Sequence, residues 1–118
     1  MSNELARRAV ACKGWRWMPG MLTATGYRVC DSYRTWPHLQ RGDTLRSGLH
    51  FPDLTDPATL GALLSLVREA WDDPAAYAVP NGGGDGGWHV CDEHAGARYV
   101  YGRGDTEAEA LVVALEMF

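Results

Sequence analysis

The sequence has no long uninterrupted run of apolar residues. Every apolar stretch is shorter than the roughly eighteen residues that a membrane-spanning helix needs. The opening residues, MSNELARRAV, are polar and helix-like, without the apolar stretch of a signal peptide. We therefore expect a cytosolic protein with no membrane partner.

Cysteine is also scarce. The three cysteines, Cys12, Cys30 and Cys91, are widely spaced. An odd number at such spacing fits free buried thiols in a reducing compartment better than a disulfide framework.

The sequence lacks the familiar motifs of catalysis. There is no nucleophile elbow, paired-carboxylate motif or phosphate-binding P-loop, and the glycine-rich residues 81–87 lack the Lys-Ser/Thr ending and predict a flexible loop. We therefore predict no enzymatic activity, no catalytic residue and no cofactor.

One cluster resembles a metal site only superficially. His89, Cys91 and His94 fall within six residues, and Cys30 or His50 could complete a set of ligands. The spacing matches none of the paired patterns that bind zinc, so we predict no metal.

The composition is that of one folded domain. The chain has 118 residues, of which 46% are hydrophobic and 22% charged. These values are typical of a globular protein with a real core. We predict a single domain over residues 1–118.

Charge is distributed unevenly along the chain. Residues 1–50 hold eight Arg or Lys against three acids, whereas residues 51–118 hold three Arg against twelve acids. Either the folded protein has one surface that attracts anions and another that repels them, or the two halves pair internally. The sequence leaves both possibilities open.

Hydrophobic periodicity and capping residues predict three helices and two hairpins. The clearest helix covers residues 57–71, with Asp56 as N-cap and Pro57 in its first turn. Thr106 and Glu109 form a capping box that opens the last helix. The first helix is predicted at residues 2–13, one hairpin at 15–18 and 26–31, and the other at 88–92 and 98–101.

This order predicts an α+β fold, an antiparallel β-sheet of about four strands packed with three helices in a layered sandwich. Residues 32–52 follow neither period, although 45–51 could add a short strand. Long irregular segments inside compact domains are often functional, which makes this segment the candidate binding region.

Aromatic and basic residues alternate in the first half of the chain. Aromatic rings stack on nucleobases and Arg binds phosphate, so the pattern favours a small anionic nucleotide. The overall acidity argues against general nucleic-acid binding. Alternatively, Trp15, Trp17 and Tyr27 belong to the core. The predicted ligand-binding residues are Tyr33, Arg34, Trp36, His38, Arg41 and Arg46.

Several motifs together resemble the phage α-β-α sandwich domain family of small phage or prophage proteins. These motifs are GWRW at 14–17, TDPAT at 55–59, a Trp-led strand at Trp88, and TEAEAL at 106–111. The resemblance implies the fold and a viral origin, and it transfers no catalytic residue. Residues 31–51 and the glycine-rich loop show no family pattern.

We therefore expect a phage counter-defence protein of the host cytoplasm, used for immune evasion. Its leading mechanism is sequestration of a nucleotide immune signal by a homo-oligomer, most simply a dimer. The alternatives are an anti-CRISPR type inhibitor of a host defence protein, or an accessory phage protein with no specific ligand. The inhibitor would act through six acids: Asp53, Asp72, Asp73, Asp92, Glu93 and Glu107.

Overall fold

The computed structural model describes residues 4–30, 38–39, 51–81, 86–94 and 96–118. These residues form an α+β fold, as predicted. The elements in chain order are α1 (Glu4–Ala11), β1 (Val29–Cys30), β2 (His38–Leu39), α2 (Pro57–Ala70), β3 (Tyr77–Pro80), β4 (Trp88–His94), β5 (Ala97–Gly104) and α3 (Glu107–Glu116). None of the helices within the described ranges has the length and hydropathy needed to cross a bilayer.

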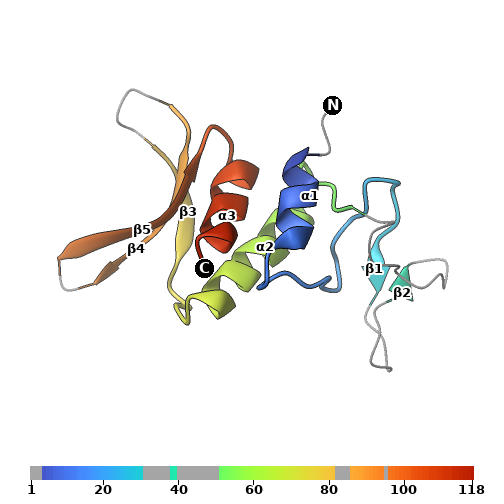
Figure 1. Ribbon diagram of the computed structural model, residues 1–118, viewed down its shortest axis with the longest axis horizontal. Helices are drawn as coiled ribbons and strands as arrows, with labels where there is room; N and C mark the ends of the chain where they lie inside the picture. Colours follow the sequence, from blue (N-terminus) through green and yellow to red (C-terminus); the bar gives the residue numbers. More distant parts are fainter. Residues whose placement is uncertain (1–3, 31–37, 40–50, 82–85, 95) are drawn as a thin grey trace.

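Helix α3 is the centre of the arrangement. The antiparallel sheet β3-β4-β5 lies on one side of α3, and α1 and α2 lie on the other (Figure 1). The buried core joins these elements, because Leu63 and Val67 of α2 and Leu111 and Leu115 of α3 are at most 1% exposed. All three described helices therefore lie to the same side of the three-stranded sheet.

Strand β5 approaches α3 very closely. A Cβ atom placed on Gly102 would lie 2.5 Å from the Ala110 carbonyl oxygen and 2.5 Å from the Ala114 nitrogen. A Cβ on Gly104 would lie 2.7 Å from the Ala110 nitrogen. Glycines on the strand and alanines on the helix thus set the short distance between sheet and helix.

The predicted helix caps are confirmed. The Asp56 side chain accepts a hydrogen bond from the Thr59 nitrogen at 3.0 Å, and Pro57 occupies the first turn of α2. The Thr106 hydroxyl oxygen accepts from the Glu109 nitrogen at 3.1 Å at the start of α3. Each cap satisfies a backbone donor that has no partner inside the helix.

Two predictions about the strands were wrong. Among the described residues the sheet has three strands rather than about four, and its edge strand β3 was not predicted. Residues 15–18 form no strand, so the predicted pairing of 15–18 with 26–31 does not occur. Strand β1 pairs with β2 instead, and the Gly20 nitrogen donates to the Val29 carbonyl at 2.8 Å.

The predicted hairpin at 88–92 and 98–101 is confirmed. The predicted strand at 45–51 lies outside the described residues except at Phe51, as does the centre of the glycine-rich loop at 82–85.

A buried carboxylate joins the end of α2 to the sheet. The Tyr101 hydroxyl donates to Asp73 Oδ2 at 2.6 Å, and the Tyr101 ring stacks on Trp71 with 4.9 Å between ring centroids. Asp73 is only 5% exposed. This hydrogen bond, together with burial, raises the pKa of Tyr101 to about 12.

We therefore expect one tyrosine to ionise near pH 12 in the folded protein, in a titration followed by absorbance at 295 nm. Because the folded-state pKa exceeds the unfolded value of about 10, the neutral phenol stabilises the fold below pH 10. That contribution is lost as the pH rises through 12. The Tyr101→Phe variant should lack this ionisation step, and its persistence in the variant would contradict the assignment.

Candidate functional site

Four short extended segments lie side by side next to the N-terminal end of α2. Thr23 pairs with Pro52, and Val29 pairs with Leu39, both antiparallel. We call these segments the β platform, which consists of residues 51–53, 22–24, 27–30 and 38–39. The tight turn at residues 23–26 closes its central hairpin, because the Gly26 nitrogen donates to the Thr23 carbonyl at 2.9 Å.

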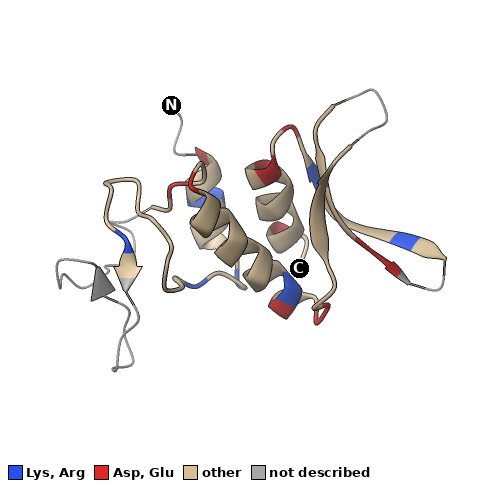
Figure 2. Cartoon of the chain, turned by 180° about the vertical axis from the view of Figure 1, so that it is seen from behind, with Lys and Arg blue, Asp and Glu red and all other residues tan. Residues whose placement is uncertain are grey.

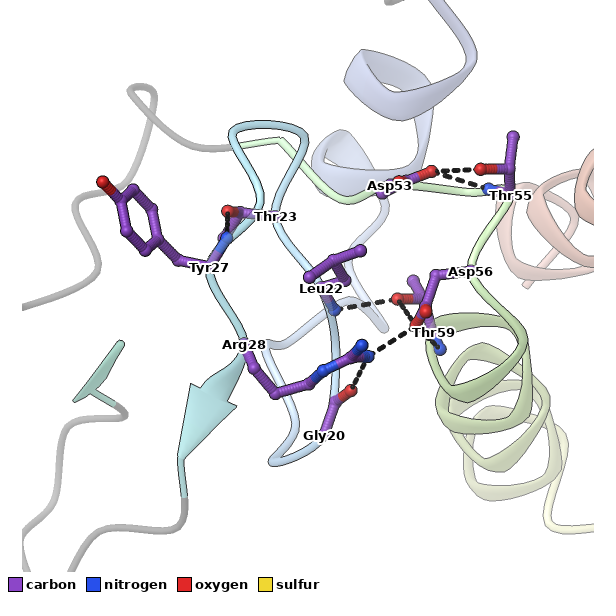
Figure 3. Close-up of polar contacts among 9 residues, drawn as sticks. All are labelled: Gly20, Leu22, Thr23, Tyr27, Arg28, Asp53, Thr55, Asp56 and Thr59. Atoms are coloured by element: carbon purple, nitrogen blue, oxygen red, sulfur yellow. Dashed lines mark hydrogen bonds and ion pairs between the residues drawn. The ribbon is translucent and has the colours of Figure 1, made fainter. Parts of the chain in front are cut away.

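A network of polar contacts ties the β platform to α2 (Figure 3). Arg28 Nη1 donates to Asp56 Oδ2 at 2.7 Å and to the Gly20 carbonyl at 2.9 Å. The same Asp56 oxygen accepts from the Thr59 hydroxyl at 2.9 Å, and the Thr59 hydroxyl oxygen accepts from the Leu22 nitrogen at 2.9 Å. Helix α2 therefore uses its own N-cap to hold the platform.

The charge of Asp56 is part of this network. The hydrogen bond from Arg28 holds the pKa of Asp56 below its usual value, and the two hydrogen bonds from Thr59 act in the same direction. Thr59 itself is fully buried, whereas the side chain of Arg28 is 40% exposed. The carboxylate thus stays ionised well into the acidic range.

The predicted ligand-binding residues belong to the two segments that leave the β platform. Tyr33, Arg34 and Trp36 lie in residues 31–37, which connect β1 to β2, and they are outside the described residues. Arg41 and Arg46 lie in residues 40–50, also outside them. The backbone of His38 is described and pairs with Cys30. Residues 31–37 precede β2 and residues 40–50 follow it, so the two segments adjoin opposite ends of that strand.

Basic residues of the first half pair with acids of the second half. Figure 2 shows Lys and Arg positions in blue and Asp and Glu positions in red along the described chain. Of the basic members of the pairs, one lies in α1, one between α1 and the β platform, and one in the β platform. Internal pairing, one of the two possibilities left open by the sequence, therefore occurs among the described residues. The pairs are Arg8–Glu116 at 2.6 Å, Arg16–Glu69 at 2.6 Å and Arg28–Asp56 at 2.7 Å.

Three of the aromatic residues belong to the core. Trp15, Trp17 and Tyr27 are partly buried and pack against the central hydrophobic cluster. The rings of Trp15 and Trp17 meet edge to face, with 5.4 Å between their centroids. Their packing confirms the core interpretation for these three.

The six acids of the alternative inhibitor surface do not all reach solvent. Asp73 and Asp92 are 5% and 4% exposed, so neither can contribute to a docking surface. Glu93 accepts a hydrogen bond from Arg98 at 3.2 Å, which offsets its charge. Asp53 Oδ1 accepts from the Thr55 hydroxyl at 2.6 Å.

A cavity of about 690 Å³ lies between the β platform and the first turns of the helices. The N-terminal ends of all three helices point toward the same, upper side of Figure 1. The apolar side chains that line the cavity come from five separate segments of the chain. Six of them are Leu5, Pro52, Leu54, Leu60, Trp88 and Ala108.

No pattern in the sequence predicted this cavity. Its lining residues are far apart in the chain and share no period, and Trp88 was noticed only as the start of a strand. The presence of the isolated apolar residue Leu54 between the acids Asp53 and Asp56 was a weak signal that this side chain is packed against the fold.

No cluster of three or more His, Cys, Asp or Glu side chains suited to a metal occurs among the residues whose side chains are described. Cys91 is fully buried and Cys12 is half-buried, and both are free thiols. Burial raises the pKa of the Cys12 thiol, which makes it less reactive.

Comparisons of the chain with models of protein families, with curated proteins and with solved structures found no match. Any function assigned to the chain therefore depends on the residues and contacts described above.

Proposed function

We propose that the protein is a small phage-encoded binding protein that counters host antiviral defence by sequestering a nucleotide immune signal. It acts by binding rather than by catalysis. Its ligand contacts are Tyr33, Arg34, Trp36, His38, Arg41 and Arg46. The observation that carries the proposal is that both segments bearing these residues adjoin one β platform, which Arg28, Asp56 and Thr59 hold on α2.

The chemistry of these residues suits a nucleotide. Trp36 and Tyr33 supply flat aromatic faces for a nucleobase, and the Arg side chains supply paired N–H donors for phosphate oxygens. Three described basic residues, Arg8, Arg16 and Arg28, bind carboxylates. We assign phosphate recognition to Arg34, Arg41 and Arg46, which lie close to the aromatic candidates in the sequence.

The oligomer and the family are part of the same proposal. Residues 31–37 and 40–50 leave β2 at opposite ends, and a homodimer gives the two segments a way to meet across a shared pocket.

Membership of the phage α-β-α sandwich family, and location in the host cytoplasm, rest on the sequence motifs alone. A layered arrangement is supported by the position of α3 between the sheet and helices α1 and α2.

Native mass spectrometry of the purified protein, with and without cyclic and ADP-ribose-derived nucleotides, tests this proposal. We expect a dimer whose mass increases by that of one nucleotide species. Trp36→Ala and Arg34→Ala should each weaken binding about 10- to 100-fold, because each loses a stacking or charge-assisted contact.

Two matched variants in the sheet serve as controls. Arg98→Ala makes the same charge change as Arg34→Ala, and Tyr99→Ala removes an aromatic ring that is 50% exposed. Both should bind nucleotide like the wild type. A monomer that takes up no nucleotide, or equal losses in all four variants, would rule out sequestration by residues 31–50.

A further inference from the structure

We propose that the cavity beside the β platform is a second binding site, specific for a small organic cation with an apolar body. The site does not use residues 31–50, so its ligand differs from the anionic nucleotide proposed above. Its apolar walls include Leu5, Leu54, Leu60 and Trp88, and its acidic side chains are Asp53 and Glu107.

The size and lining of the cavity suit a small molecule. A volume of about 690 Å³ falls within the range of about 300–1,000 Å³ typical of small-molecule sites. The elements that form the walls are held in place by contacts within the protein, without a ligand. The Asp56 network joins α2 to the β platform, and α3 packs on β5 and on α2. The cavity is therefore preformed, which lowers the entropic cost of binding.

The charges at the cavity select a cation. Of the described residues that line it, Asp53 and Glu107 are the charged ones, and both are acidic. The Asp53 carboxylate is held in place, since its Oδ1 accepts from the Thr55 nitrogen at 2.9 Å and from the Thr55 hydroxyl at 2.6 Å. The N-termini of the three helices carry about half a positive charge each, so the two carboxylate charges together outweigh them.

The indole of Trp88 adds a second preference for a cation. Among aromatic side chains, tryptophan has the face that attracts an ammonium group most strongly. The same ring offers a large flat surface to an apolar ring of the ligand. A ligand with an aromatic or branched apolar body and one ammonium group therefore matches both features of the site.

Tryptamine is a suitable probe, with the neutral analogue indole-3-ethanol and the anionic analogue indole-3-acetate for comparison. Isothermal titration calorimetry should show tryptamine binding about 10-fold more tightly than the alcohol, and the acetate more weakly than either. In ¹H–¹⁵N NMR spectra, tryptamine should shift the Trp88 indole N–H and the amides of Leu5, Leu54 and Ala108. Equal affinities for the three probes, or shifts confined to other residues, would overturn the proposal.

Charge variants test the role of the two acids. Glu107→Gln and Asp53→Asn should each weaken tryptamine binding about 3- to 10-fold and leave the binding of the alcohol unchanged. Glu93→Gln is the matched control, because Glu93 lies at the far end of the β4–β5 hairpin and pairs with Arg98. Equal effects of all three substitutions would show that net charge, not the cavity, attracts the probe.

A filling variant tests the place of binding. Ala24 is exposed at the edge of the cavity, so Ala24→Trp should occupy part of the space without disturbing the core. We expect it to abolish tryptamine binding, whereas Ala97→Trp at an exposed position in the sheet should have no effect. A thermal unfolding curve for each variant identifies any loss of folding. Retention of binding by a folded Ala24→Trp variant would exclude the cavity.

Discussion

Replacing Gly102 with alanine should lower the free energy of unfolding by about 3 kcal/mol. The added methyl group would meet the Ala110 carbonyl oxygen and the Ala114 nitrogen, each at 2.5 Å. Both atoms belong to the backbone of α3, so no side-chain rotation relieves the clash. The sheet and α3 would have to separate, which weakens packing along the whole of β5.

Gly61→Ala is the matched control, because it adds the same methyl group to a glycine with nothing within 4 Å of the new atom. Gly61 is an exposed residue of α2, where alanine should raise stability by about 0.5–1 kcal/mol. Urea denaturation followed by circular dichroism measures both variants. A Gly102→Ala protein as stable as the wild type would show that β5 and α3 are not in close contact.

Local signals in the sequence predicted the elements that depend on local interactions. Helix α2 has a cap at Asp56, proline at its first position and leucines at helical spacing, so its bounds were predicted to within one residue. The hairpin of β4 and β5 was predicted from alternation around a short turn. Strand β3 was missed because it has only four residues, one of them Pro80, and pairs with β4 across the glycine-rich segment.

The first hairpin shows how turn geometry decides between competing partners. Residues 15–18 have a strand-like composition, but pairing them with 26–31 needs a long connection. The chain instead uses the tight turn ending at Gly26, whose φ of 93° suits glycine, and pairs Leu22 with Arg28. The apolar side chains of Trp15 and Trp17 then pack on the core without belonging to a strand.

The sites were less predictable than the fold. Residue types could mark Trp36 and Arg34 as candidate ligand contacts, because stacking and phosphate binding depend on side-chain chemistry. The cavity depends on where Leu5, Leu54 and Trp88 meet in space, which no local pattern encodes. The outcome of the charge asymmetry was equally unpredictable, because the sequence does not show which basic side chains pair with which carboxylates.

Replacing Asp56 with alanine should lower the free energy of unfolding by about 3 kcal/mol, because one carboxylate serves two purposes. The variant loses the N-cap of α2, worth about 1 kcal/mol in typical helices. It also leaves the hydroxyl of the fully buried Thr59 without its acceptor and removes the carboxylate partner of Arg28, which keeps its hydrogen bond to the Gly20 carbonyl. Hydrogen exchange should accelerate at the Leu22 and Val29 amides, which hold the β platform together.

The Asp56→Asn variant separates the two purposes. Asparagine caps helices about as well as aspartate, so this variant keeps the cap and loses only the ion pair with Arg28. Because Arg28 is 40% exposed, the expected loss is smaller, about 1 kcal/mol. Equal losses in the two variants would contradict a separate role for the cap.

Acid should remove the advantage of the wild type over Asp56→Asn and reduce its advantage over Asp56→Ala, because protonation removes only the ionic part of the Asp56 contacts. The hydrogen bond from Arg28 lowers the pKa of Asp56 in the folded protein, so its stabilising effect is complete above the unfolded pKa of about 3.9. The effect is lost as the pH falls through the lower folded-state pKa. Urea unfolding between pH 7 and pH 2 should therefore show the difference in unfolding free energy between wild type and Asp56→Ala narrowing only below about pH 4. A gap that does not change with pH would mean that the ionised carboxylate does not hold the β platform on α2.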